Sequence, residues 1–197
     1  GSCDIYCSRN KAGVWSNPLN AGTPVNSPAW ESQPSISANG ESLYFVSSRA
    51  GGKGGMDIWK CNLKGFSISG LPVWGKPINL GDSINTPGNE MSPFIHSDGK
   101  TLYFASDFWP GMGGFDIFYS RLKNDSVWST PRNIGFPINS FKDEQGLVVD
   151  ASGKKAYYSS DRPGSKGMDI YSFKLYQAAR PNPVSYIKGK VVDEDTG

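Results

Sequence analysis

The sequence has little of several features that define common classes of protein. Charged residues make up 19% of its 197 residues, and its longest basic run is Lys154-Lys155. It therefore lacks the electrostatic footprint of a protein that binds nucleic acid or anionic lipid. No apolar run approaches the roughly 20 residues of a membrane-spanning helix, and stretches rich in Ala, Leu, Glu and Lys are few, which argues against a helical bundle. We expect neither a nucleic-acid partner nor a transmembrane span.

Groups that carry metal, redox or nucleophilic chemistry are also scarce. The cysteines Cys3, Cys7 and Cys61 allow at most one disulfide, and His96 is the only histidine. A Cys-x3-Cys pair with one distant cysteine and one imidazole does not make a zinc site. Without a Gly-x-Ser-x-Gly elbow, catalysis by a Ser-His-Asp triad has no support either, so His96 is expected to be structural or on the surface. We expect no catalytic residue, no metal and no cofactor.

Turn-forming and aromatic residues are abundant instead. The chain has 24 glycines and 14 prolines, and 13% of its residues are aromatic. Such a composition excludes a disordered tail, and the glycines lack the three-residue period of collagen. Many short strands joined by tight turns fit this composition, so we expect an all-β fold.

A repeat is the main signal in the sequence. An Asp-Ile-aromatic tripeptide recurs at intervals of 53, 59 and 53 residues, beginning at Asp4, Asp57, Asp116 and Asp169. The landmarks that follow in register are a tryptophan (Trp15, Trp74 and Trp128), an acidic residue (Glu31, Glu90 and Glu144) and a turn glycine (Gly40, Gly99 and Gly153). A Leu-Tyr-Phe-like strand and a Gly-rich loop close each unit. A period near 50 with about four antiparallel strands per unit is typical of a β-propeller blade.

The repeat also predicts how the units begin and end. Units closing near residues 4–56, 57–115 and 116–175 are expected, each with a hairpin such as the one at Asp98-Gly99, where we expect a primed two-residue turn. Closed propellers typically have at least four blades. We therefore expect these three units to be part of a larger propeller, completed by further blades of a longer parent protein or by another chain.

The repeat resembles a known family. The run from Glu90 to Ser106, which includes Ser-Asp-Gly-Lys-Thr-Leu-Tyr-Phe-Ala-Ser, and the Gly-Gly-x-Asp-Ile steps at 54–58 and 113–117 are similar to the WD-like repeat of TolB-type propellers. With the Pro-Ile-Asn steps, they resemble the propellers of OmpA-family outer-membrane lipoproteins of Bacteroidota, including the PorE-like component of type IX secretion. The resemblance covers residues 1–176.

The same resemblance extends to the end of the chain. Residues 186–197 look like the first strand of a carboxypeptidase-regulatory-like β-sandwich, with residues 177–185 as the linker. The resemblance implies a periplasmic, outer-membrane-associated location. It also implies peptidoglycan binding through domains outside this segment.

Three sets of residues are candidates for structural or binding roles. Because the tripeptide aspartates recur in every unit, we expect them to accept backbone N–H bonds from their Gly-rich turns rather than to catalyse a reaction. The glutamates of the repeat are expected to form hydrogen bonds or salt bridges between blades. Phe108 and Trp109 break the repeat in a loop and are the best local candidates for contact with a partner. The remaining candidates for partner contact are Glu31, Glu90, Glu144, Arg49 and Arg162.

These observations favour a non-enzymatic scaffold that binds envelope or outer-membrane proteins through its loops. A glycan- or peptidoglycan-binding propeller, with aromatic and acidic groups at the channel mouth, is the alternative. A glycoside hydrolase is the third hypothesis, and it would need two differentiated carboxylates roughly 5–10 Å apart.

Overall fold

The fold is all-β, as the composition predicts. In the computed structural model, residues 3–124 and 126–185 are described; they contain no α-helix and one short 3-10 helix, η1 (Gln177–Ala179). No helix among them is long and apolar enough to cross a membrane. The predicted β-sandwich strand at residues 186–197 lies outside the described residues.

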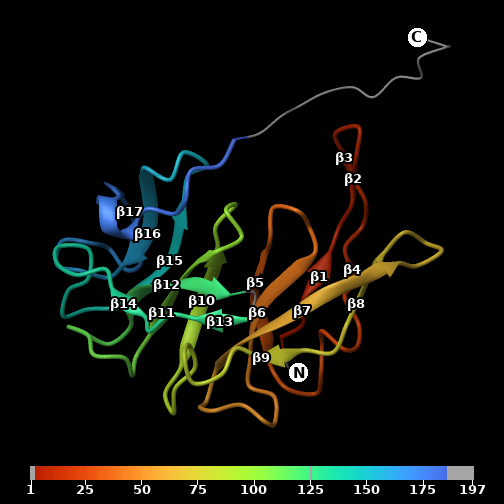
Figure 1. Ribbon diagram of the computed structural model, residues 1–197, viewed down its shortest axis with the longest axis horizontal. Coiled ribbons are helices and arrows are strands. Elements are labelled where there is room, and N and C mark those ends of the chain that lie inside the picture. Colours follow the sequence, from red (N-terminus) through yellow and green to blue (C-terminus); the bar gives the residue numbers. More distant parts are fainter. Residues whose placement is uncertain (1–2, 125, 186–197) are drawn as a thin grey trace.

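Three antiparallel sheets follow one another along the chain, and we call them blades 1, 2 and 3 (Figure 1). Blade 1 consists of β5 (Glu31–Ile36), β6 (Ser42–Ser47), β7 (Asp57–Phe66), β8 (Pro72–Trp74) and β9 (Ile78–Asn79). Blade 2 consists of β10 (Glu90–Ile95), β11 (Thr101–Ser106), β12 (Asp116–Asn124), β13 (Val127–Trp128) and β14 (Arg132–Asn133). Blade 3 consists of β15 (Glu144–Val149), β16 (Lys155–Ser160) and β17 (Asp169–Lys174).

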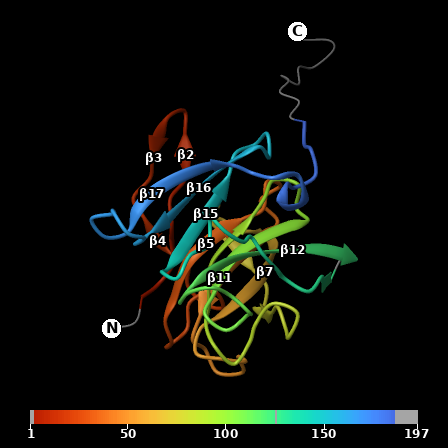
Figure 2. The same ribbon diagram turned by 90° about the vertical axis from the view of Figure 1, so that its left-hand side faces the viewer.

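The N-terminal residues form the outer part of a further unit beside blade 1. Its strands pair as β1 with β4 and β2 with β3, and they are β1 (Tyr6–Cys7), β2 (Asn10–Lys11), β3 (Val14–Trp15) and β4 (Leu19–Asn20). Ile5 packs with Phe45 and Trp59 of blade 1, so this unit continues the same stacking. Figure 1 shows the N-terminal strands at the opposite end of the array from blade 3, and Figure 2 views the array from the blade-3 end.

The first strand of each blade lies on the inside of the array. Strand β10 contacts both β5 and β15, and the Ser92 amide donates to the Gln33 side-chain oxygen at 2.7 Å. Each inner strand carries a β-bulge at the same place, with a positive φ at Gln33, Ser92 and Gly146. A bulge bends its strand locally, so the three inner strands share one shape.

Apolar side chains join each blade to the next. Between blades 1 and 2, Tyr44 and Ile58 pack against Phe104 and Trp128, with the Tyr44 and Trp128 rings edge to face at 6.4 Å. Ile117, the repeat counterpart of Ile58, packs in the same way between blades 2 and 3. These aromatic and branched residues occur at the same repeat positions, so one packing pattern is used twice.

The outer face of blade 3 is uncovered by any described residue. Ile58 and Ile117 are completely buried, whereas Ile170, at the same repeat position, is 79% exposed. Similarly, Trp74 and Trp128 are buried, but Trp15 of the N-terminal unit is exposed. Both ends of the array therefore present positions that neighbouring blades bury elsewhere. The described residues do not form a closed ring.

The hairpin turns differ from the predicted primed two-residue type. The glycines do adopt positive φ, at +73° (Gly40), +64° (Gly99) and +68° (Gly153). However, the Gly99 amide bonds to the His96 carbonyl, and the His96 amide bonds to the Thr101 carbonyl, so four residues form the loop. In blade 2 the Asp98 carboxylate stabilises this longer loop by accepting hydrogen bonds from the Lys100 and Thr101 amides.

Candidate functional site

The repeated aspartates hold the Gly-rich loops. Asp57 accepts backbone N–H bonds from Lys53 and Gly54, and Asp116 accepts them from Met112 and Gly113. Their blades bury both carboxylates almost completely. In the less complete third blade, exposed Asp169 accepts one such bond, from the Lys166 amide. The N-terminal Asp4 accepts a hydrogen bond from the Asn20 side chain, as Asp57 does from the corresponding Asn79.

The repeated glutamates begin the inner strands and are fully buried. Glu31 accepts hydrogen bonds from the amide and hydroxyl of Ser27 and from the hydroxyl of Ser47. Glu90 and Glu144 have the same set of donors, supplied by Thr86 and Ser106 and by Ser140 and Ser160. Because each carboxylate is surrounded by donors of its own repeat, it links the incoming loop to the strand hairpin.

Arginines complete this network in blades 1 and 3. The Arg49 guanidinium lies 3.1 Å from the Glu31 carboxylate and donates to the Pro24 and Val25 carbonyls. Arg162 repeats these contacts with Glu144 and with residues 137–138. Both arginines are therefore engaged within their own repeats.

Blade 2 replaces the arginine with two aromatic residues. Phe108 occupies the position of Arg49, and the indole N–H of Trp109 donates to the Ile84 carbonyl at 3.0 Å. Ile84 is the counterpart of Val25, so Trp109 satisfies a carbonyl that arginine satisfies in blade 1. Trp109 also packs against the core between blades 1 and 2. Of the two predicted contact residues, Trp109 thus has a structural role, while Phe108 is more than half exposed.

The buried carboxylates of Glu31 and Glu90 differ in their electrostatics. Burial alone raises the pKa of Glu31, but hydrogen bonds from Ser27 and Ser47 and the charge of Arg49 outweigh it and hold that pKa below its usual value. In blade 2, burial dominates, and with Asp57 nearby it raises the pKa of Glu90 despite hydrogen bonds from Thr86 and Ser106.

Two pockets of the same construction open beside these networks. The blade-3 pocket has a cavity volume of about 510 Å³ and is lined by Met112, Phe136, Pro137, Ser140, Phe141, Arg162 and Pro163. The blade-2 pocket, of about 430 Å³, is lined by Asp82, Asn85, Thr86, Pro87, Phe108, Trp109 and Pro110. Five residues of one pocket have their repeat counterpart in the other pocket. The first of these pairs is Asp82 with Phe136, and the last is Trp109 with Pro163. We call this pair the rim pockets.

The blade-3 pocket is the more apolar of the two. At the edge of the blade-2 pocket, the Lys53 amine pairs with the Asp82 carboxylate at 2.6 Å. One repeat later, Met112 and Phe136 stand at these two positions, and the Phe136 ring is 78% exposed. Phe141, which replaces Pro87, is 67% exposed. Large apolar surfaces that remain exposed in a concave site are typical of ligand or partner binding.

The sequence analysis did not single out Met112, Phe136 or Phe141. These residues lie in the same Gly-rich and Pro-Ile-Asn segments that define the repeat, so they looked like variation within it. Comparison of the two repeats position by position was the signal that could have found them. One repeat has an ion pair where the next has two apolar residues. The fold accommodates both, so the difference indicates that this surface has a role in binding.

His96 is buried and belongs to the turn of blade 2. Its ring accepts a hydrogen bond from the Asp98 amide at 3.1 Å, and its other nitrogen lies 3.3 Å from the Asp150 carbonyl. Burial raises the pKa of Asp98, but the adjacent His96 side chain and hydrogen bonds from Lys100 and Thr101 outweigh it and hold that pKa far below its usual value. Among the described residues, no group of three or more His, Cys, Asp or Glu side chains is placed to hold a metal ion.

Comparison with known proteins supports the fold and gives no family. No family model and no curated protein matches the chain. Among solved structures, it is similar to the crystal structure of an alpha-L-arabinofuranosidase from Lactobacillus brevis, with a TM-score of 0.55 and 17% sequence identity. The match covers 82% of this chain and 54% of the arabinofuranosidase, so the chain spans about half the length of that enzyme. At this identity the similarity shows the fold alone.

This similarity corrects our prediction that the chain is not an enzyme. The prediction relied on carboxylates that recur in every blade, and it took a propeller-like repeat as a sign of a scaffold. The finding that the fold is shared with an arabinofuranosidase overturns that inference, because it is a fold on which a glycoside-cleaving enzyme is built.

Proposed function

We propose that the chain is a carbohydrate-binding segment of a β-propeller, and that the rim pockets hold the apolar faces of sugar units. The observation that carries the proposal is the pair of corresponding pockets, one repeat apart. A polysaccharide presents the same chemical unit at regular intervals, so a repeated site suits a repeated ligand. The similarity in fold to an arabinofuranosidase supports a glycan rather than another polymer as the first ligand to test.

The chemistry of the pockets is consistent with sugar recognition. Aromatic rings offer flat apolar surfaces, while a small number of polar groups can fix the orientation of a ligand. In the blade-3 pocket these are Phe136 and Phe141 on the apolar side and Arg162 and Ser140 on the polar side. In the blade-2 pocket, Phe108 supplies the exposed ring, and Asp82 lies at the edge.

A protein partner is the second candidate, and the exposed apolar cluster of Met112, Phe136 and Phe141 favours it. Clusters of this kind also mark protein interfaces.

From the family resemblance we further propose a location in the bacterial envelope, associated with the outer membrane. Such a protein would combine this segment with peptidoglycan-binding domains, and type IX secretion would be one setting for it.

Replacing Phe141 with Ala is expected to weaken binding of arabino-oligosaccharides about tenfold, which corresponds to roughly 1.4 kcal/mol. The expectation follows because the ring is exposed and its loss removes a stacking surface without opening the core. Isothermal titration calorimetry measures the effect. Phe66→Ala is the matched control, because Phe66 is an equally exposed ring at the far end of β7.

Four outcomes are informative. If oligosaccharides bind and Phe141→Ala weakens binding while Phe66→Ala does not, the glycan proposal holds. If neither oligosaccharides nor soluble peptidoglycan fragments bind at millimolar concentration, the glycan proposal fails. Capture of an envelope protein that is lost in Phe141→Ala would then support the second candidate. Release of reducing sugar in the same mixtures would show that binding is accompanied by hydrolysis.

A further inference from the structure

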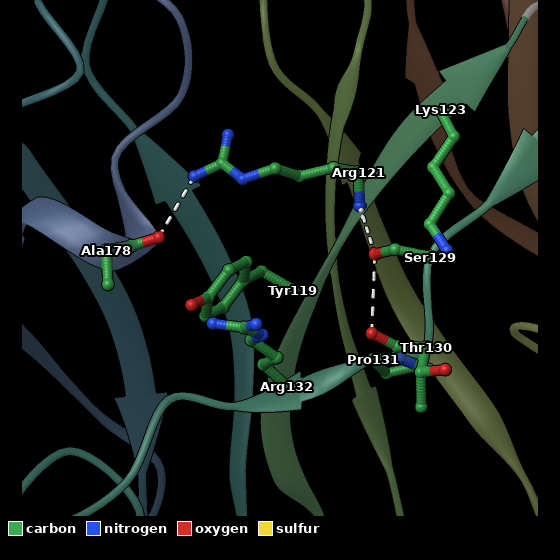
Figure 3. Close-up of a pocket in the computed structure, with 8 residues that line it drawn as sticks. All are labelled: Tyr119, Arg121, Lys123, Ser129, Thr130, Pro131, Arg132 and Ala178. Atoms are coloured by element: carbon green, nitrogen blue, oxygen red, sulfur yellow. Dashed lines mark hydrogen bonds between the residues drawn. The ribbon is translucent and has the colours of Figure 1, made fainter.

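A basic cleft lies on the outer side of blade 2, away from the rim pockets. Its cavity volume is about 560 Å³, and its lining comes from β12, from the segment leading into β14, and from η1 (Figure 3). The lining residues are Tyr119, Arg121, Lys123, Ser129, Thr130, Pro131, Arg132 and Ala178. In the view of Figure 3, the buried Tyr119 lies between Arg121 and Arg132.

The blade-2 to blade-3 junction encloses a larger cavity than the preceding junction does. Between blades 1 and 2, Trp128 packs on Tyr44, and the corresponding cavity is only about 180 Å³. Between blades 2 and 3, η1 follows β17 directly and places the small Ala178 at the cleft. The cavity is therefore a consequence of how the array continues after β17.

The cleft of blade 2 carries more positive charge than the corresponding positions of blade 1. Its cationic residues are Arg121, Lys123 and Arg132, whereas the positions one repeat earlier are Asn62, Lys64 and Ile78. No carboxylate lines the cleft. Among residues 3–124 and 126–185, no ion pair neutralises any of the three cations.

One of the three cations is held in a fixed position. Arg121 donates to the Thr101 hydroxyl at 3.2 Å and to the carbonyls of Ala178 and Arg180 at 3.0 and 2.6 Å. These bonds tie the C-terminal segment to blade 2 and leave part of the five-donor guanidinium group available. Lys123 and Arg132 are exposed and make no such structural bonds with the described residues. The cleft thus combines one oriented cation with two adaptable ones.

We infer that the basic cleft is a binding site for a ligand that carries an oxyanion, either a carboxylate or a phosphate, on a sugar-sized body. Guanidinium and ammonium groups form their strongest hydrogen bonds with such oxyanions, and Arg does so in a planar, two-pronged manner. The hydroxyls of Ser129 and Thr130 supply further polar contacts. The site does not depend on the rim pockets, which lie at a different part of the blades and are largely apolar.

The test compares acidic and neutral probes on the full chain. Trigalacturonate, glucose 6-phosphate and inorganic phosphate are titrated by calorimetry at low salt, with neutral galactotriose as the uncharged probe. We expect at least one of the acidic sugars to bind and galactotriose not to bind at the cleft. Whether the uronate or the sugar phosphate binds more tightly distinguishes the two sources of the oxyanion. Raising the salt concentration should weaken binding.

Variants locate the binding to the cleft. The double variant Lys123→Gln/Arg132→Gln should weaken binding of the acidic probe at least tenfold, because it removes two of the three cations. Both residues are exposed, so their loss leaves the fold intact. The control Lys64→Gln/Lys76→Gln removes the same charge from blade 1, with Lys64 at the repeat position of Lys123, and should have no effect. Failure of every acidic probe to bind would overturn the inference. Galactotriose binding that is weakened equally by the same double variant, or equal weakening of acidic-probe binding in the control, would do so as well.

Discussion

Ile117→Asp is expected to destabilise the protein by at least about 3 kcal/mol, whereas Ile170→Asp should change its stability by less than about 0.5 kcal/mol. The two residues occupy the same repeat position and the same place in the Asp-Ile-aromatic strand. Ile117 is completely buried between blades 2 and 3, and Ile170 is 79% exposed. A carboxylate without a partner is strongly disfavoured in a packed interface, but it is tolerated in water.

Urea denaturation followed by far-ultraviolet circular dichroism measures both effects. Since the two substitutions are chemically identical, differences in strand propensity or net charge cannot account for a difference between them. An equal loss of stability in both variants would mean that another part of the molecule covers the outer face of blade 3. The packing pattern described here would then be incomplete.

Glu31→Gln and Glu90→Gln are expected to show opposite dependence on pH. Because the folded-state pKa of Glu31 is lowered, its contribution to stability is present above its unfolded pKa and is lost as the pH falls through the folded value. The folded-state pKa of Glu90 is raised, so the protein is more stable at low pH and loses that stability as the pH rises from the unfolded to the folded pKa.

The cost of Glu31→Gln should therefore be greatest near neutral pH, at roughly 2 kcal/mol. By the same reasoning, the cost of Glu90→Gln should be smaller at neutral pH than in acid. Urea denaturation over a series of pH values gives both curves, and Glu41→Gln, at an exposed position, is the control. Parallel curves for the two variants would contradict the claim that hydrogen bonds and Arg49 outweigh burial at Glu31, whereas burial dominates at Glu90.

The hairpins were predictable because their signals are local. A glycine after a polar residue, followed by a Leu-Tyr-Phe-like strand, is sufficient to place β5–β6 and β10–β11. The wrong turn type has a local cause as well. The Asp98 carboxylate accepts hydrogen bonds from the amides of Lys100 and Thr101, which follow the glycine. These bonds stabilise a loop of four residues. A dipeptide rule does not include such a contact from a side chain to the backbone.

The sites were less predictable because they are formed between repeats. The sequence marks Trp109 as a contact residue, but it does not indicate that the indole replaces an arginine in bonding to a carbonyl 25 residues away. The blade-3 pocket takes Met112 from one Gly-rich loop and Phe136 from the next blade connection. The basic cleft combines Ala178 of η1 with cationic residues of blade 2. Such features require the register of neighbouring blades, which sequence spacing alone does not provide.

The dependence of affinity on ligand length tests the central proposal most directly. If the rim pockets bind successive parts of one glycan, oligosaccharides long enough to reach both should bind at least tenfold more tightly than short ones, since the second contact becomes intramolecular. Phe141→Ala should abolish this gain, whereas the affinity of the blade-2 pocket for short oligosaccharides should not change. Calorimetry over a series of oligosaccharide lengths should show this step in affinity. Affinity that is independent of length, or no binding at any length, would contradict the proposal.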